Sequence, residues 1–298
     1  MDLVEAERLL AASPDHRVLK RIPPPASWGL DARSGPGVRR AVYVDVETTG
    51  LDPESDEVIE LALLPFEYDR ATGEIVRVLD QEAFSGLRQP SIPIPAASTQ
   101  VHGLADADVA GQSIPAEAVA RVMASAQLVI AHNATFDRPM VEKHWPVFEA
   151  LGWACSLTDI GWREEGLASG KLEYLLMHEG WFYDGHRALS DALAGVFLLS
   201  RALPVSRRPA LAVLLESARR PLKAVRAENA PFEARAVLKS RGYRWDAGDG
   251  TRSKAWWIAT QDPDAEVDWL HRAVYAGPRK VPVIDLPATR RYSARQWA

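Results

Sequence analysis

Two acidic residues on a hydrophobic strand constrain this chain more than any other feature of its sequence. Asp45 and Glu47 lie two positions apart where the apolar run 42–46 meets the turn 48–50. Alternate residues of a strand face the same side, so both carboxylates are expected on one face. There they would repel each other and lose hydration, a cost that a bound divalent cation relieves. The ordinary alternative is an edge strand whose polar face is solvated.

Two more acids and a histidine lie where elements of secondary structure begin or end. Asp137 follows the apolar run 128–131 and falls in the first turn of the next expected helix. Asp191 begins another helix, with Ser190 as the expected N-cap and His186 in the preceding loop. Each has an ordinary explanation, because acids near a helix N-terminus complement its dipole and loop histidines are usually surface residues.

The order of the expected elements predicts an α/β protein. Strand patterns come first and are followed by alternating helices and strands, which favours a mixed sheet with helices on its faces. The first three strands have no helix between them, so we expect an antiparallel meander. The expected strands are 42–46, 58–67, 75–84 and 128–131, and the expected helices are 115–126, one from 135 onward, 171–179 and 190–202.

Charge divides the chain into an acidic body and a basic end. The net charge is 35 − 40 = −5 overall, 21 − 31 = −10 over residues 1–222 and 14 − 9 = +5 over residues 223–298. Cys155 is the only cysteine, which excludes an internal disulfide and argues against a Cys-based zinc site. No signal-peptide pattern and no membrane-length apolar run is present, so we expect a cytoplasmic protein without a membrane partner.

Four parts are expected along the chain. Residues 1–39 form an N-terminal arm, 40–203 the main domain, 204–222 a connecting helix and linker, and 223–298 a small basic α+β domain. In the last part we expect a strand, a helix over 231–239, strands around 243–245 and 255–259, and a helix over 263–275.

Taken together, the acids and the histidine resemble the signature of the DEDDh exonuclease superfamily. That group includes the proofreading subunit of bacterial replicative polymerases and oligoribonuclease. The resemblance covers about residues 40–203, and it extends to the segments 48–51, 99–104 and 132–137 around the signature. The five signature positions are Asp45, Glu47, Asp137, His186 and Asp191.

The resemblance implies a ribonuclease H-like fold and two divalent metal ions, Mg²⁺ or Mn²⁺. Asp45 is expected to bridge the ions, Glu47 and Asp191 to complete one site, and Asp137 to reach the other. His186 is the expected general base, because an unperturbed imidazole titrates close to neutral pH.

A nucleotide pocket is also implied by the resemblance. Thr48, Gly50 and Leu51 match the turn that holds the terminal nucleotide, with Leu51 as an apolar wedge. His102 matches a contact to the terminal sugar or phosphate, and Phe136 is expected near the terminal base. The ordinary alternatives are a turn glycine, a core leucine and a loop histidine.

The basic end interleaves cations with aromatic rings, in residues 241–245 and 254–257. That pattern is typical of a grip on single-stranded nucleic acid, and it is equally typical of a small domain that needs large side chains for its core. Trp256 and Trp257 are adjacent on an expected strand, so they should face opposite sides. The segment resembles an extension of some stand-alone bacterial members of the superfamily.

The expected function is a metal-dependent 3′→5′ exonuclease that releases mononucleotides, acting on the single-stranded 3′ ends of DNA. The same chemistry on RNA, a proofreading partner of a polymerase, and a catalytically silent nucleic-acid-binding module remain alternatives. A homodimer is compatible with the resemblance. The biological role stays open between repair, RNA turnover and defence.

Overall fold

The computed structural model describes residues 2–297, so the outermost residues of the predicted arm and C-terminal domain lie outside it. The chain forms two compact units, residues 1–218 and 219–298. The division of the chain into four parts stays a prediction. None of the described helices is long and apolar enough to cross a membrane.

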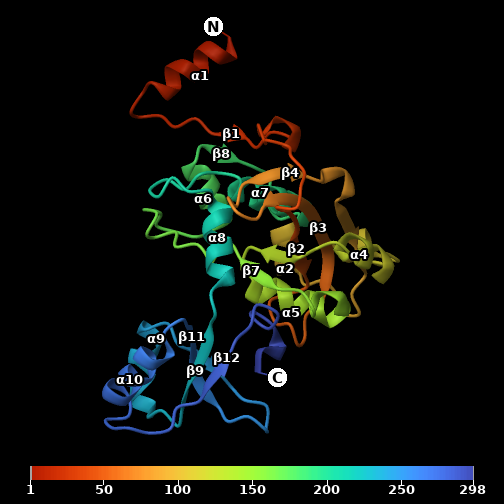
Figure 1. Ribbon diagram of the computed structural model, residues 1–298. Coiled ribbons are helices and arrows are strands. Elements are labelled where there is room, and N and C mark those ends of the chain that lie inside the picture. The colour runs from red at the N-terminus through yellow and green to blue at the C-terminus, as the bar shows by residue number, and fades with distance from the viewer. Residues whose placement is uncertain (1, 298) are drawn as a thin grey trace. The chain divides into compact units, whose positions relative to one another are not determined.

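A mixed sheet forms the centre of the first unit (Figure 1). Its order is β4-β3-β2-β6-β7, and β5 also pairs with β3. The β2–β3, β3–β4 and β3–β5 pairs are antiparallel, whereas β2–β6 and β6–β7 are parallel. The strands are β2 (Val38–Thr48), β3 (Val58–Asp69), β4 (Ile75–Val78), β5 (Phe84–Leu87), β6 (Leu128–Ala131) and β7 (Trp153–Cys155). The predicted antiparallel meander and the mixed α/β sheet are confirmed.

The predicted strand 75–84 is wrong as one element. β4 pairs with β3 at Phe66–Tyr68, and β5 pairs with β3 nearer its other end, at Glu60–Leu63. The chain therefore turns between them through a 3₁₀ segment, Asp80–Glu82. β7 was not expected, because a strand of three residues is defined by its pairing with β6 rather than by a pattern of its own.

Eight helices are described in the first unit, and the predicted ones are present with shifted ends. They are α1 (Leu3–Ala11), α2 (Ala96–His102), α3 (Asp106–Val109), α4 (Ala116–Met123), α5 (Ala134–His144), α6 (Leu172–His178), α7 (Ala188–Leu199) and α8 (Ala210–Arg219). The short helices α2 and α3 were not predicted. The helix predicted over 190–202 begins two residues earlier, at Ala188, and ends at Leu199.

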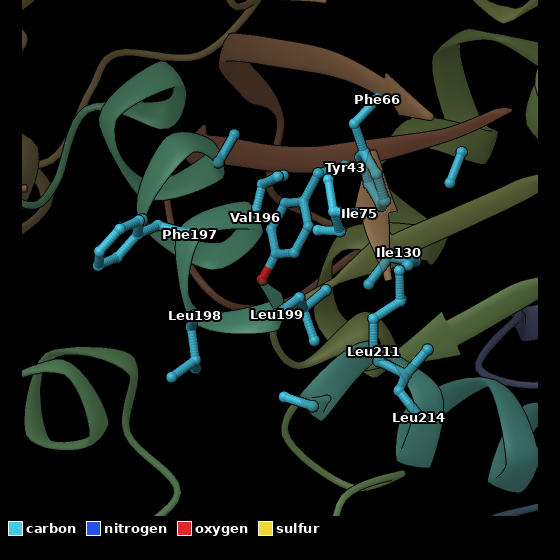
Figure 2. Packing of buried hydrophobic residues seen from close by; sticks show 14 of the residues in the cluster. Tyr43, Phe66, Ile75, Ile130, Val196, Phe197, Leu198, Leu199, Leu211 and Leu214 are labelled. Carbon is cyan, nitrogen blue, oxygen red and sulfur yellow. The ribbon is translucent and has the colours of Figure 1, made fainter. Parts of the chain in front are cut away.

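The main core lies between the sheet and helices α6, α7 and α8. Figure 2 shows Tyr43 and Ile130 from the sheet among Leu199 of α7 and Leu211 of α8. Helix α7 approaches the sheet closely, since a Cβ on Gly195 would lie 2.1 Å from the Tyr43 ring. The contact fixes α7 against β2 on the face that also carries the odd-numbered residues of that strand.

Part of the N-terminal arm is built into this unit. β1 (Lys20–Arg21) pairs in parallel with β8 (Trp181–Phe182). Farther along the arm, the Trp28 ring lies 5.0 Å from the Phe197 ring, which the Trp181 ring also contacts at 5.1 Å. The arm thereby covers part of α7.

The second unit is a small α+β domain with an antiparallel sheet in the order β10-β11-β9-β12. Its elements are β9 (Lys223–Glu228), α9 (Arg235–Ser240), β10 (Arg244–Asp246), β11 (Ala255–Thr260), α10 (Pro263–Ala273) and β12 (Val283–Asp285). The helix predicted over 231–239 divides into a 3₁₀ turn, Phe232–Ala234, and α9. Trp256 and Trp257 face opposite sides, as predicted: they belong to different hydrophobic clusters.

Candidate active site

Strand β2 places two carboxylates on the face covered by α7. Asp45 and Glu47 continue the row that begins with buried Tyr43, and both are partly exposed while Val44 and Val46 are buried. The alternation follows from the strand period of two. Asp191 of α7 meets them, so that one carboxylate oxygen from each of Asp45, Glu47 and Asp191 lies within 4.8 Å of the others.

Asp191 accepts hydrogen bonds from Tyr183 and from the backbone of His186 and Arg187. The Tyr183 hydroxyl donates to its Oδ1 at 2.7 Å, and the Arg187 backbone N–H donates to its Oδ2 at 3.2 Å. The second contact shows that the prediction of Ser190 as N-cap is wrong. The helix begins two residues before Ser190, and Asp191 reaches back to an N–H at the helix start.

Asp137 approaches from α5 and is buried. Backbone N–H groups of Asp137 itself and of Val46 stabilise its ionised form, yet burial outweighs them and raises the pKa of Asp137 well above its usual range. Its charge also raises the pKa of Asp45. Asp137 is not part of the tight group of three oxygens formed by Asp45, Glu47 and Asp191 among the described residues.

Burial and mutual repulsion make this cluster reluctant to carry its full negative charge. Burial first, and then the charges of Asp137, Asp191 and Glu47, raise the pKa of Asp45 well above its ordinary value. Burial, with Asp191 and Glu60, raises the pKa of Glu47 to about 8. Burial also raises the pKa of Asp191, against the hydrogen bond from the Tyr183 hydroxyl. Crowded carboxylate oxygens with this electrostatic cost are the donor set that hard divalent cations prefer.

Glu60 of β3 stands directly opposite Glu47 in the β2–β3 register and is 2% exposed. The Arg187 guanidinium contacts both of its oxygens, Nη2 to Oε1 at 2.9 Å and Nε to Oε2 at 3.1 Å. The Ala188 backbone N–H also donates to Oε2 at 3.2 Å. Glu60 therefore ties the start of α7 to the sheet beside the acidic cluster.

His186 lies at the edge of this cluster. It is exposed, has a left-handed backbone conformation with φ of 64°, and directly precedes the Arg187 cap of α7. Its charge lowers the pKa of Asp191, which places the imidazole within electrostatic reach of the acids.

The predicted pocket residues occupy the loop after β2 and its surroundings. The Thr48 hydroxyl donates to the Gly50 carbonyl at 2.6 Å, and a Cβ on Gly50 would lie 2.5 Å from an Asp56 oxygen, so the turn is tight. Leu51 is 83% exposed, which contradicts the ordinary reading of this residue as a core leucine. Phe136 is half-buried on α5.

His102, at the end of α2, is buried and next to the acidic site. Its Nδ1 accepts from the Leu104 N–H at 3.1 Å, and a hydrogen bond to the Thr48 backbone favours the charged form of the ring. Burial lowers the pKa of His102. The charge of His186 lowers it further, whereas the charge of Glu60 raises it. His102 is therefore close to the β2 end that carries Glu47.

Two residues of the site were not singled out from the sequence. Tyr183 and the side chain of Arg187 touch it only through the tertiary contacts with Asp191 and Glu60. The one signal in the sequence that could have pointed to Arg187 is its position directly after His186.

Comparison with known proteins agrees with this geometry. The exonuclease model named RNase_T matches residues 42–199, more than half of the chain and including all five predicted signature positions. The chain belongs to this exonuclease family. The DEDDh-type resemblance and the ribonuclease H-like fold are thereby confirmed.

Individual relatives match this exonuclease over parts of their length. The chain is 39% identical over 99 residues to the DNA polymerase III subunit epsilon-like protein of Rhodobacter capsulatus, covering 32% of this chain and 13% of that protein. It is 28% identical over 170 residues to DNA polymerase III PolC-type of Clostridium perfringens, covering 53% of this chain and 11% of that protein. The exonuclease thus spans about a tenth of these relatives.

Solved structures are also similar. Exonuclease X in complex with 5′ overhanging duplex DNA is 23% identical with a TM-score of 0.45, over 60% of this chain and 99% of the other. E. coli exonuclease I in complex with a dA16 oligonucleotide is 13% identical with a TM-score of 0.46, over 76% of this chain and 63% of the other.

Proposed function

We propose that this exonuclease removes mononucleotides from the 3′ ends of single-stranded DNA by hydrolysis at the acidic cluster, with two divalent ions, Mg²⁺ or Mn²⁺. The observation that carries the proposal is the convergence of Asp45, Glu47 and Asp191 oxygens beside buried Asp137. A protein that only bound nucleic acid would gain nothing from grouped acids that repel one another and their phosphate ligand.

The residues present fit a divalent metal site. The donor set is made of carboxylate oxygens, and the charge that the fold crowds together is the charge that cations would neutralise. Asp45, Glu47 and Asp191 would hold one ion, and Asp45 with Asp137 would hold the second. When bound, the ions would lower the pKa of water and neutralise charge on the scissile phosphate.

The chain's own groups would do the rest of the work. His186 would accept the proton of the attacking water, and its exposed position on a short loop leaves it accessible to substrate. Tyr183 and the Arg187 N–H would hold the Asp191 carboxylate in one orientation. His102 and the turn of Thr48, Gly50 and Leu51 would bind the terminal nucleotide, with exposed Leu51 packing against its base or sugar.

Support for DNA as the polymer comes from the relatives, both of which carry DNA polymerase III in their names. RNA would require accommodation of the 2′-hydroxyl at the terminal sugar. The proposed preference is therefore for DNA over RNA of the same sequence.

Degradation of 5′-labelled single-stranded DNA and RNA of matched sequence tests the proposal. With Mg²⁺ or Mn²⁺ we expect a ladder of 5′-labelled products that shortens from the 3′ end, faster on DNA, and abolished by EDTA. Immediate release of the label as a mononucleotide would show that degradation starts from the 5′ end instead. A faster RNA ladder would reassign the substrate, and no cleavage of either polymer would refute the proposal.

A further inference from the structure

A pocket of about 500 Å³ opens on the C-terminal unit. The volume is in the range of sites for nucleotide-sized ligands. Its wall combines aromatic rings with cations and includes no carboxylate residue. The lining residues are Ala230, Pro231, Phe232, Arg235, Lys239, Trp245 and Trp256. We call it the Trp245 pocket.

The Trp245 pocket includes aromatic side chains that the core of this unit does not bury. Trp245 and Trp256 are cross-strand neighbours on β10 and β11, with ring centroids 5.5 Å apart. Trp256 packs against the core cluster, whereas Trp245 is 53% exposed and Phe232 is 79% exposed. On the opposite face Trp257 is buried. Core packing thus accounts for Trp257 and for part of Trp256, but it does not account for two exposed rings at one pocket.

The cations of the pocket are also exposed. Arg235 and Lys239 are four residues apart on α9, which places them on one face of the helix. Neither forms an ion pair among the described residues. By contrast, Asp246 contacts the Arg226 guanidinium at 2.6 Å, and Glu266 contacts Arg241 at 2.8 Å. The charge left at the pocket is therefore complementary to an anionic ligand.

We infer that the Trp245 pocket binds single-stranded nucleic acid, separately from the acidic site. An unpaired base stacks on Trp245 beside Phe232, and the neighbouring phosphates lie against Arg235 and Lys239. Every base has a stacking face, so the pocket accepts strands of any base sequence. It requires bases that are unpaired and not hidden in a duplex. The inference does not depend on hydrolysis, because binding at this pocket requires neither the acids nor metal ions.

The test measures the affinity of the full chain for a 5′-labelled single strand of about 20 nucleotides by fluorescence anisotropy. EDTA and the Asp191→Asn substitution are used together so that no cleavage occurs. Trp245→Ala should weaken binding by about 5- to 150-fold, from the stacking contribution of about 1–3 kcal/mol per base. Trp245→Phe should keep most of the affinity. An abasic strand of equal length and charge should bind with the same affinity whether or not the protein carries Trp245→Ala.

Charge is tested with a matched pair of double variants. Arg235→Ala with Lys239→Ala should lower the slope of log K against log salt by about 1.4, since each phosphate contact on a single strand contributes about 0.7. Arg272→Ala with Lys280→Ala removes the same charge from exposed positions of the same unit, outside the pocket. That control should leave the slope nearly unchanged.

Circular dichroism and thermal unfolding confirm that each variant is folded, which the exposure of Trp245 favours. Unchanged affinity of Trp245→Ala for the base-containing strand would overturn the inference and direct attention to an aromatic peptide as the occupant. Equal losses on the abasic strand, or equal slope changes for the two double variants, would overturn it as well. A loss confined to the base-containing strand supports it even if the protein cleaves nothing, so this test and the hydrolysis test fail separately.

Discussion

Replacing Arg187 with alanine should destabilise the exonuclease unit more than replacing Glu60 with glutamine. The two groups form one ion pair, but the Glu60 side chain is 2% exposed and the Arg187 side chain is 53% exposed. Without Arg187 the buried carboxylate keeps, within residues 2–297, only the Ala188 N–H as a hydrogen-bond donor. Without the charge on Glu60, the guanidinium is left half in water.

The asymmetry sets the magnitudes. Removing one partner so that a buried charge is uncompensated costs about 3–5 kcal/mol, and the exposure of Arg187 places Arg187→Ala near about 3 kcal/mol. Glu60→Gln keeps an acceptor for Ala188 and relieves the repulsion with Glu47, so it should cost about 1 kcal/mol. For a unit of this size, those values lower Tm by about 6–12 °C and about 2–4 °C.

Thermal and urea unfolding of both variants measure the difference, with Arg208→Ala as the control. Arg208 and Glu216 form an equally direct pair at 2.7 Å, but both side chains are about half exposed. The control should cost less than about 1 kcal/mol. The reasoning is refuted if Arg187→Ala is no worse than Arg208→Ala, or if Glu60→Gln is the more damaging of the two site variants.

Three other changes probe the same unit. Gly195→Ala places a Cβ 2.1 Å from the Tyr43 ring and should lower the free energy of unfolding by about 1–3 kcal/mol or more. An unchanged midpoint of urea unfolding would contradict the close packing of α7 on β2. Tyr183→Phe removes the donor to Asp191 and should raise the Mg²⁺ concentration for half-maximal activity by about 10- to 100-fold, with stability changed by about 1 kcal/mol; an unaltered metal titration would argue against a positioning role. Because the pKa of Glu47 rises from 4.5 to about 8 on folding, the folded state retains a proton that the unfolded state releases, so metal-free stability should fall as pH rises from about 4.5 to about 8. Thermal unfolding in EDTA and in Mn²⁺ checks this, since the ion should reverse the fall and Glu47→Gln should make it shallower, with Asp45, Asp137 and Asp191 supplying the remainder.

The shared face of Asp45 and Glu47 could be predicted because it depends only on the period of a strand. The meeting of these acids with Asp191 came from the family resemblance, since no local pattern relates residues more than a hundred positions apart. Helix positions were predicted less well at their ends. Ser190 lost the N-cap role because Arg187 and Ala188 find partners in Asp191 and Glu60, and the second of these contacts spans 128 positions.

The elements that were missed are short or depend on distant partners. β7 has three residues and exists through its parallel pairing with β6. In the sequence, Tyr183 resembles any partly buried aromatic residue. Only the tertiary structure shows that its hydroxyl lies 2.7 Å from Asp191. In the basic C-terminal unit, the sequence left core packing and nucleic-acid binding open; Trp257 is buried in the core, whereas Trp245 is exposed and carries the proposed binding role.

The most direct test of the central claim compares Asp191→Asn with Asp184→Asn in mononucleotide release from single-stranded DNA with Mg²⁺. Both substitutions remove one negative charge, but Asp184 is 80% exposed, pairs with Arg21 and is not one of the three clustered acids. We predict that Asp191→Asn lowers kcat/KM by more than the roughly 100-fold upper range for groups that merely support a metal ligand, while Asp184→Asn stays within about twofold. Equal rates for the two variants would contradict hydrolysis at the acidic cluster.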